Sequence, residues 1–522
     1  MLSRNDGISS GSIEYFIDRV KYSLKYGLAR IEKECIDSSR QILPRRVNGF
    51  NYERGFELLE SGNEYSAGSQ ICSSAHNETV ILRETENEIR LVVDEKYHQK
   101  GYALLEMIGH QPSDSVSFMQ IIFSLVHLDD EIPFIVERIA DGVKLKGKML
   151  SYEYDSYLAA DLSTIFPQPP FLIPDDWKFE WGGRYETTLL LNSLSLRCAY
   201  HFLAIYFSAR KRNLSGGGCN DLVLVIQKEE LYHDIEILSS LPHEVIQIFV
   251  DKITYGVGVK SPDPALQPII PLGGNLLAIA PLHILSCHLE RNLLALHART
   301  NSREFNAMSA AFEDVMTARI IAGLTDKWSY IDANVTWAID GEKEEMDILI
   351  ADVSNRRLLV CELRWTIQPG DPREVQQRKE YCFEKVVQLR RKVEWLRPNI
   401  VKAVSEIFKI STEECAGAWQ VDGVVVIDGF GGVQSKDDAY PIIPAKIFEF
   451  AMDKISSLNQ FNDWIKSLDW LPQENVYFEM KDRRIQLEGV DIAYEGMEVI
   501  QERPQYFDYI ASTIARYQPT NF

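Results

Sequence analysis

The stretch MDILIADVSNRRLLVCELRW, residues 346–365, decides the fold expected for the second half of this chain. It contains two apolar runs, at 345–353 and 358–365, each with the length and the content of valine, isoleucine and leucine that are typical of a buried strand. The residues SNRR between them favour a tight turn. The stretch therefore predicts a β-hairpin.

The length of the turn fixes which residues face one another, because opposed residues in an antiparallel pair have a constant index sum. A two-residue loop at 354–355 would place Asp347 opposite Glu362, and a loop at 355–356 would place Asp347 opposite Arg364. Side chains alternate with period two along a strand, so both registers place all three charged residues on one side of the sheet. A three-residue loop would break this agreement.

Other elements follow on either side of the hairpin. A helix is predicted from Asn301 to about Gly323, on the capping pair Asn301 and Glu304 and the spacing of Phe305, Met308, Phe312 and Val315. Further strands are predicted at 334–339 and 421–428, and a long helix at 373–396 has the apolar stripe Val375, Cys382, Val386, Leu389, Val393 and Leu396. The predicted order is helix, three strands, helix, strand.

The remainder of the chain is less specific. Helical spacing predicts an amphipathic helix over about 12–43, and 46–265 alternates short apolar runs with polar and glycine clusters, as in a mixed α/β domain. Residues 430–522, with a helix near 443–455 and a hairpin-like run at 475–494, extend the C-terminal part. We expect three regions: residues 1–45, an N-terminal helix; 46–295, a mixed α/β domain of unknown role; and 296–522, the domain that contains the hairpin.

Composition excludes several classes of protein. With 522 residues, 45% apolar and 25% charged, the chain resembles folded proteins of several domains. A net charge of -21 excludes a protein whose whole surface coats nucleic acid or an anionic membrane. The eight cysteines form no CxxC pair, no secretory leader is visible, and prolines and glycines interrupt the uncharged stretch 266–288. We expect a cytoplasmic protein with no membrane partner.

The strand at 358–365 changes character along its length. Its same-face positions Leu358 and Val360 are apolar, and they are followed by Glu362 and Arg364. A carboxylate at this point is costly unless it is paired, hydrated or bound to a metal ion. Two carboxylates that converge can hold a hard cation such as Mg²⁺, which activates water for phosphodiester hydrolysis.

At these residues the chain resembles the PD-(D/E)xK nuclease superfamily, in which an Asp opens the second strand and an acidic-x-Lys triplet ends the third. The resemblance covers about 130 residues and includes the order of the elements. It implies a restriction-endonuclease-like core, α-β-β-β-α-β with a mixed sheet flanked by helices, fused to a larger mixed α/β N-terminal region. It also implies Asp347 and Glu362 as ligands of Mg²⁺ or Mn²⁺, with Glu313 as the upstream acidic ligand and the main-chain carbonyl of Leu363 as a further one.

The chain departs from the motif at Arg364, where the superfamily usually has lysine. Arginine stays protonated and cannot act as a base, although it can stabilise a transition-state phosphate. Lys385 and Gln388, one turn apart on the following helix, are candidate catalytic substitutes. An exposed helix face with no catalytic role is the alternative interpretation of these two residues.

The helix at 373–397 also differs from the acidic chain as a whole. It has eight basic residues against four glutamates, a net charge of plus four, which favours a surface that follows phosphates. The basic residues are Arg373, Arg378, Lys379, Lys385, Arg390, Arg391, Lys392 and Arg397.

Two hypotheses on function follow. The first is a Mg²⁺- or Mn²⁺-dependent endonuclease acting on nucleic acid, expected to be DNA, as an effector of a bacterial restriction or antiviral defence system by analogy of architecture. The second is a catalytically silent nuclease-like fold that binds nucleic acid or a protein partner as a scaffold subunit, or that forms homo-oligomers. A solvated hairpin edge with one salt bridge is the interpretation without any function.

Overall fold

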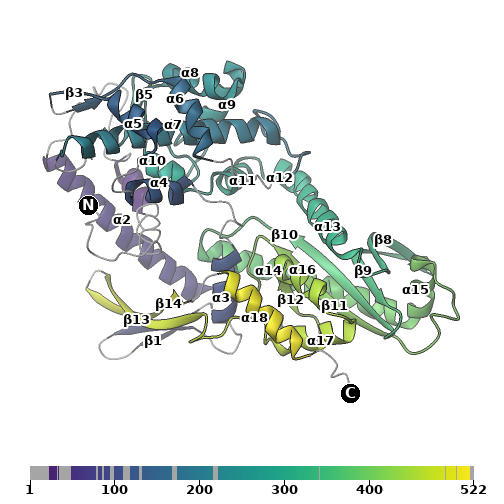
Figure 1. Ribbon diagram of the computed structural model, residues 1–522. Helices are drawn as coiled ribbons and strands as arrows, with labels where there is room; N and C mark the ends of the chain where they lie inside the picture. Colours follow the sequence, from purple (N-terminus) through teal and green to yellow (C-terminus); the bar gives the residue numbers. More distant parts are fainter. Residues whose placement is uncertain are drawn as a thin grey trace. The chain divides into compact units, whose positions relative to one another are not determined.

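The protein is a mixed α/β molecule with several sheets (Figure 1). The computed structural model describes residues 23–31, 33, 49–77, 80–84, 88–93, 99–109, 118–127, 132–147, 149–166, 173–214, 221–339, 341–487, 489–500 and 503–517. The chain divides into two compact units, the first from Met1–Gly68 and Pro112–Met308, the second from Ser69–Gln111 and Ser309–Phe522.

This division differs from the three regions expected from the sequence. The later boundary lies at 308/309 instead of 295/296, and the segment 69–111 belongs to the second unit. The reason is packing at long range, because Tyr102, Leu104 and Leu105 are buried in the core of that unit. Local periodicity contains no information about such a contact. Of the predicted N-terminal helix, residues 23–31 and 33 are helical, and the rest of 12–43 lies outside the described residues.

The first unit is mainly helical. Its long central helix α7 (Arg184–Lys211) is buried along most of its length, and the remaining elements are short. They are α4 (Phe118–His127), α5 (Phe134–Asp141), β3 (Lys144–Lys146), β4 (Met149–Ser151), α6 (Ser156–Asp161), β5 (Leu224–Gln227), α8 (Lys228–Ser239), α9 (His243–Lys252), β6 (Ile269–Pro271), β7 (Leu276–Ile279), α10 (Pro281–Ser286), α11 (Leu289–Thr300) and α12 (Ser302–Met308). Helix α2 (Gly49–His76) contains the junction between the two units.

The uncharged stretch 266–288 forms β6, β7 and α10, as its prolines and glycines predicted. In the described part of the chain, no helix is both long and apolar enough to cross a membrane.

The second unit is built on a five-stranded mixed sheet in the order β12-β11-β10-β9-β8. β8, β9 and β10 are antiparallel neighbours, and β10, β11 and β12 are parallel. The elements are α13 (Ala310–Leu324), β8 (Ile331–Ile339), β9 (Glu342–Asp352), β10 (Arg357–Trp365), α14 (Pro372–Leu396), α15 (Ile400–Phe408), β11 (Gln420–Asp428), β12 (Ile442–Pro444), α16 (Ala445–Lys454) and α17 (Leu458–Ser467). The predicted order of elements is confirmed, with α15 inserted before β11.

Helices cover both faces of this sheet (Figure 1). On one face α14 and α15 pack in a core that contains Leu349, Leu358, Val386 and Leu389, the α14-side core. On the other face α13, α16 and α17 pack in the α13-side core, which contains Met316, Ile348, Leu359, Val424 and Phe448. Both faces of β10 and β11 are therefore buried, as is typical of strands with parallel neighbours.

Helix α13 differs in two details from the expectation. The predicted single helix is broken at Ser309, so that Asn301 and Glu304 begin α12, where their side chains are 3.3 Å apart, and α13 continues one residue beyond Gly323. Val315 is 47% exposed, because the buried side of α13 passes through Phe312 and Met316.

The second unit also contains a separate four-stranded sheet in the order β1-β2-β14-β13. Its strands are β1 (Val80–Glu84), β2 (Ile89–Val93), β13 (Phe478–Leu487) and β14 (Val490–Val499), and α3 (Gln99–Gly109) and α18 (Arg503–Ala515) complete the unit. The hairpin predicted at 475–494 is confirmed as β13 and β14, and the helix predicted near 443–455 is confirmed as α16. β14 pairs in parallel with β2, which joins the two segments of the unit.

Candidate active site

The hairpin of β9 and β10 determines the geometry of the site. Its register pairs Arg357 with Asp352 and Cys361 with Ile348, an index sum of 709. The ladder ends at that pair, and the same sum would place the next two residues, Asp347 and Glu362, opposite each other. The loop has four residues, 353–356, instead of the two expected. Arg356 makes the turn possible with φ 52°, and its amide donates to the Val353 carbonyl at 3.3 Å. Because four is also an even number, the two carboxylates share a side of the sheet as predicted.

Asp347 lies where the side chains of β8 and β9 switch from one core to the other. In a regular strand Ala333 and Val335 would share a face, and so would Met346 and Ile348. Here Ala333 and Ile348 pack toward the α13-side core, whereas Val335 and Met346 pack in the α14-side core. Asn334, with φ 52°, lies between Ala333 and Val335, opposite Asp347 in the register. The continuous burial of β9 ends at this position, and the Asp347 side chain is 25% exposed.

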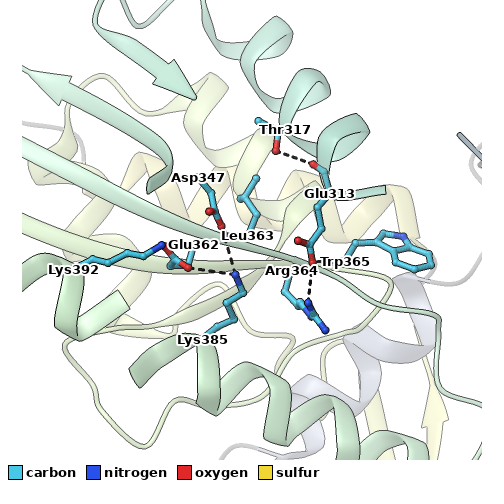
Figure 2. A network of polar contacts seen from close by, with 9 residues as sticks. All are labelled: Glu313, Thr317, Asp347, Glu362, Leu363, Arg364, Trp365, Lys385 and Lys392. Atoms are coloured by element: carbon cyan, nitrogen blue, oxygen red, sulfur yellow. Dashed lines mark hydrogen bonds and ion pairs between the residues drawn. The ribbon is translucent and has the colours of Figure 1, made fainter. Parts of the chain in front are cut away.

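Glu362 is fully buried on the side of the sheet that α14 covers. Two lysines of α14 pair with it: Lys385 Nζ lies 3.3 Å from Oε2, and Lys392 Nζ contacts Oε1. Lys385 Nζ also lies 3.7 Å from Asp347 Oδ2, so one ammonium group is shared by the two carboxylates (Figure 2). Asp347 and Glu362 therefore converge, as the sequence predicted.

Among the described residues, the negative charges of Asp347 and Glu362 are balanced by two lysines. Burial raises the pKa of Glu362, and the negative charge of Asp347 raises this pKa further, whereas the ammonium groups of Lys392 and Lys385 lower it. Two carboxylates and two ammonium groups have no net charge. Such a group can be buried only because each charge has a close partner.

Leu363 lies beside Asp347 through its backbone. Its amide donates to Asp347 Oδ2 at 2.7 Å, and its side chain is buried in the α13-side core. The main chain of Leu363 is thus next to both carboxylates. Its predicted role as a carbonyl ligand of a metal ion stays a prediction.

Glu313 and Arg364 form a second pair (Figure 2). Arg364 donates to Glu313 Oε1 at 3.2 Å, the Trp365 amide donates to the same oxygen at 3.3 Å, and the guanidinium of Arg364 lies 5.2 Å from the ring centroid of Tyr381. No group of three or more carboxylate, histidine or cysteine side chains that could hold a metal ion occurs in the described ranges. Glu313 would have to release Arg364 in order to act as the predicted third ligand.

Helix α14 provides the basic side chains of the site. It begins at Pro372, and the Asp371 side chain caps it by accepting from the amides of Arg373 and Glu374, both at 2.9 Å. Lys385 faces the carboxylates, whereas Gln388, predicted as an alternative, is exposed.

Lys392 was predicted only as one basic residue of a phosphate-following surface, whereas in the structure it is buried beside Glu362. It follows Lys385 by seven residues, a spacing that returns to the same side of a helix, and this was the signal that could have found it. Its side chain is 10% exposed.

The carboxylate pair is not part of either of two hollows on the surface. One of about 530 Å³ is lined by residues 300–304 and 307, and another of about 480 Å³ is lined by residues of 398–412. Neither contains a predicted site residue.

In comparisons with known proteins, no model of a protein family, no curated protein and no solved structure matches the chain.

Proposed function

We propose that the second unit is a divalent-metal-dependent nuclease of the PD-(D/E)xK type that hydrolyses phosphodiester bonds in DNA. The observation that carries the proposal is the convergence of Asp347 and Glu362 on one ammonium group, at 3.7 and 3.3 Å. The order α13, β8, β9, β10, α14, β11 and the mixed sheet with helices on both faces support the restriction-endonuclease-like fold. An effector of bacterial defence remains the setting that we propose by analogy.

Carboxylate oxygens are the ligands that a hard divalent cation prefers, which supports this part of the proposal. Mg²⁺ in phosphate-processing sites is commonly held by one or two carboxylates, with water and substrate oxygens as its other ligands. Asp347 and Glu362 would supply the carboxylates, and the Leu363 carbonyl would supply a further oxygen. The bound ion would lower the pKa of a coordinated water and neutralise charge on the phosphate.

The lysines have different roles in this proposal. Lys385 reaches both carboxylates, is 16% exposed on its side chain, and would move toward the scissile phosphate when a cation takes its place. Lys392 contacts only Glu362 and is more deeply buried, so it would hold the orientation of that carboxylate. Lys385 therefore takes the role of the lysine of the superfamily motif in this proposal, because Arg364 stays protonated and cannot act as a base.

The test begins with Mn²⁺ binding, measured by calorimetry on the full chain. We expect Asp347→Asn and Glu362→Gln to abolish binding, and Lys385→Met to tighten it severalfold because a competing cation is removed. Wild-type protein should cleave linear DNA with Mg²⁺ or Mn²⁺, and all three variants should lose at least about 100-fold in rate. The exposed Asp314→Asn variant on α13 serves as a control that keeps both properties.

One observation favours the second hypothesis, a silent scaffold. Glu362 is 0% exposed and already paired with two lysines, an arrangement that is stable without a metal ion. Absence of Mn²⁺ binding together with retained DNA binding would support the scaffold and contradict the nuclease.

A further inference from the structure

The Lys385 ammonium lies at the position between the two carboxylates that a divalent cation would take. Its Nζ lies 3.3 Å from Glu362 Oε2 and 3.7 Å from Asp347 Oδ2, and Figure 2 shows both contacts as dashed lines. Carboxylate oxygens are also the ligands that Mg²⁺ and Mn²⁺ prefer in proteins. Lys385 and a metal ion therefore compete for the same two side chains.

A divalent cation would unbalance the charges of the site. Asp347 and Glu362 carry two negative charges, which the ammonium groups of Lys385 and Lys392 neutralise. Glu362 is fully buried and Lys392 is buried beside it, so water screens these charges only weakly. An added divalent cation would change the net charge of this group from zero to plus two. Its binding is therefore weak unless a positive charge leaves the site or a negative charge enters it.

Lys385 is the lysine that can leave. Its side chain is 16% exposed, against 10% for Lys392, and it lies farther from the carboxylate oxygens than Lys392 does. Among the described residues, Asp347 and Glu362 are the two carboxylates within ion-pair distance of Lys385. The residues three and four positions away on α14 provide no carboxylate: Tyr381, Cys382, Gln388 and Leu389. A displaced Lys385 ammonium thus needs an anion that a ligand supplies.

A phosphodiester is an anion of the required kind. Each phosphate of a DNA strand carries one negative charge, and its oxygens accept hydrogen bonds from ammonium groups and bind hard cations. Lys385 would move from the two carboxylates to a phosphate oxygen, which keeps its charge paired. The ligand that supplies this phosphate would then favour metal binding. By thermodynamic linkage the metal ion would favour binding of that ligand by the same factor.

We infer that Lys385 is an internal counter-ion that holds the metal affinity of the site low until DNA is present, so that the metal ion and the DNA phosphate bind as a coupled pair. The inference rests on the proposed function for the identity of the site. It adds the regulation of that site, because the chain without DNA keeps its two carboxylates neutralised by its own lysine.

The test measures Mn²⁺ binding to the full chain by electron paramagnetic resonance of the free ion, with and without a phosphorothioate oligodeoxynucleotide that resists cleavage. The Mn²⁺ bound by the oligonucleotide alone is subtracted. We expect DNA to raise the Mn²⁺ affinity of the wild-type chain by at least about tenfold. Saturating Mn²⁺ should raise the DNA affinity, measured by fluorescence anisotropy, by the same factor.

Substitution of Lys385 separates its charge from its packing. Lys385→Met should bind Mn²⁺ without DNA severalfold more tightly than wild type, and the increase that DNA produces should fall to about threefold or less. Lys385→Arg keeps a positive charge at this position, so its Mn²⁺ affinity without DNA should stay no higher than that of wild type. Circular dichroism verifies that both variants are folded.

Arg390→Gln is the matched control. Arg390 belongs to the same helix, but it pairs with Asp437, at 3.7 Å, instead of with the two carboxylates of the site. The substitution removes one positive charge from α14 and leaves Lys385 in place. Any loss of DNA affinity in this variant should be equal with and without Mn²⁺, so that the coupling between the two ligands is unchanged.

Four outcomes would overturn the inference while Mn²⁺ still binds: no effect of DNA on the Mn²⁺ affinity of wild type, no tighter binding by Lys385→Met, loss of the coupling in Arg390→Gln, or an increase produced by an oligoribonucleotide alone. The first three would leave the proposed metal site intact. Absence of Mn²⁺ binding in every protein, with and without DNA, would contradict the proposed function and the inference together.

Discussion

Lys392 is the residue on which the buried charge of Glu362 most depends. Its ammonium contacts Oε1 of a carboxylate that is 0% exposed, and its own side chain is 10% exposed. Removing one partner of a buried ion pair leaves an uncompensated charge, which usually costs several kcal/mol. The two residues are therefore expected to be coupled in stability, whether or not the site binds a metal ion.

We expect Lys392→Met to lower the free energy of unfolding by about 3 kcal/mol. The double variant Glu362→Gln, Lys392→Met should recover much of this loss, because the charge that needed Lys392 is gone. A double-mutant cycle of urea unfolding measures the coupling. Additive effects of the two substitutions would show that the two charges do not depend on each other.

His201 is the residue of the first unit for which the structure predicts the clearest pH dependence. It is 6% exposed, its Nδ1 lies 2.6 Å from the Tyr152 hydroxyl, and its Nε2 lies 2.9 Å from the Asp221 carbonyl. Burial lowers the pKa of His201 to about 3, and the charge of Arg197 acts in the same direction. The folded protein therefore keeps this imidazole neutral at a pH where the unfolded chain takes up a proton.

The sign of the effect follows from this difference. Below about pH 6.5 the unfolded state binds one more proton than the folded state, so the free energy of unfolding falls as the pH decreases toward 3. We expect a loss of about 1.4 kcal/mol per pH unit from this residue. In His201→Gln this loss of unfolding free energy should disappear. Urea unfolding of both proteins at pH 6.0 and 5.0 measures how steeply the free energy of unfolding of each changes with pH. Identical slopes in the two proteins would assign the acid sensitivity to other groups.

The sequence predicted the two converging carboxylates but only part of their surroundings. Asp347 and Glu362 could be paired because the parity of the turn, and not its length, decides which side of the sheet a residue takes. The partners of Arg364 could not be found in this way. Glu313 reaches it from α13 and Tyr381 from α14, and contacts between elements depend on packing that local spacing does not contain.

At the scale of the element, β8 contains a backbone conformation that the sequence did not reveal. The predicted strand at 334–339 extends to Ile331 in the structure, with Asn334 at φ 52° inside it. Asparagine tolerates this region better than other residues with a side chain, and glycine tolerates it best. The change in the core faced by β8 and β9 occurs at this residue.

We expect Asn334→Gly to keep the stability of the second unit within about 0.5 kcal/mol, and Asn334→Val to lower it by about 1 to 2 kcal/mol. Thermal unfolding followed by circular dichroism gives the comparison. Thr336→Val, at another exposed position of the same strand, is the control and should have little effect. An equal loss in both valine variants would mean that the conformation at Asn334 is not what costs stability.

Periodicity was sufficient for most of the elements around the site because their apolar stripes are long. The stripe of α14 from Cys382 to Leu396 is buried as predicted. The break at Ser309 was not visible, since the spacing of apolar residues continues through it. Helix ends depend on capping and tertiary contacts more than on periodicity.

At the scale of the whole molecule, the second unit is discontinuous in the sequence. Tyr102 packs against Trp470, with ring centroids 6.0 Å apart, and the Glu106 carboxylate accepts from the Gly431 amide. Leu104 and Leu105 are also buried in this core. A fragment that begins at residue 309 therefore lacks part of its own core.

We expect a fragment 309–522 to be insoluble or to lack a cooperative unfolding transition. Joining residues 69–111 to its N-terminus through a flexible linker should restore cooperative unfolding, because the missing side chains and strands are supplied. Differential scanning calorimetry of the two fragments distinguishes these outcomes. A cooperative transition in 309–522 alone would show that the second unit folds without residues 69–111.

The pairing of β2 with β14, Leu91 beside Tyr494, also has a consequence for biosynthesis. On the ribosome, β2 emerges before its neighbour β14 by about 400 residues, which is roughly 20 to 80 seconds at ordinary elongation rates. During that interval β2 is paired only with β1, and its other edge has no partner strand. A polypeptide truncated before β14 (Val490–Val499) would keep that edge of β2 open permanently, and quality-control proteases would meet it with an incomplete sheet.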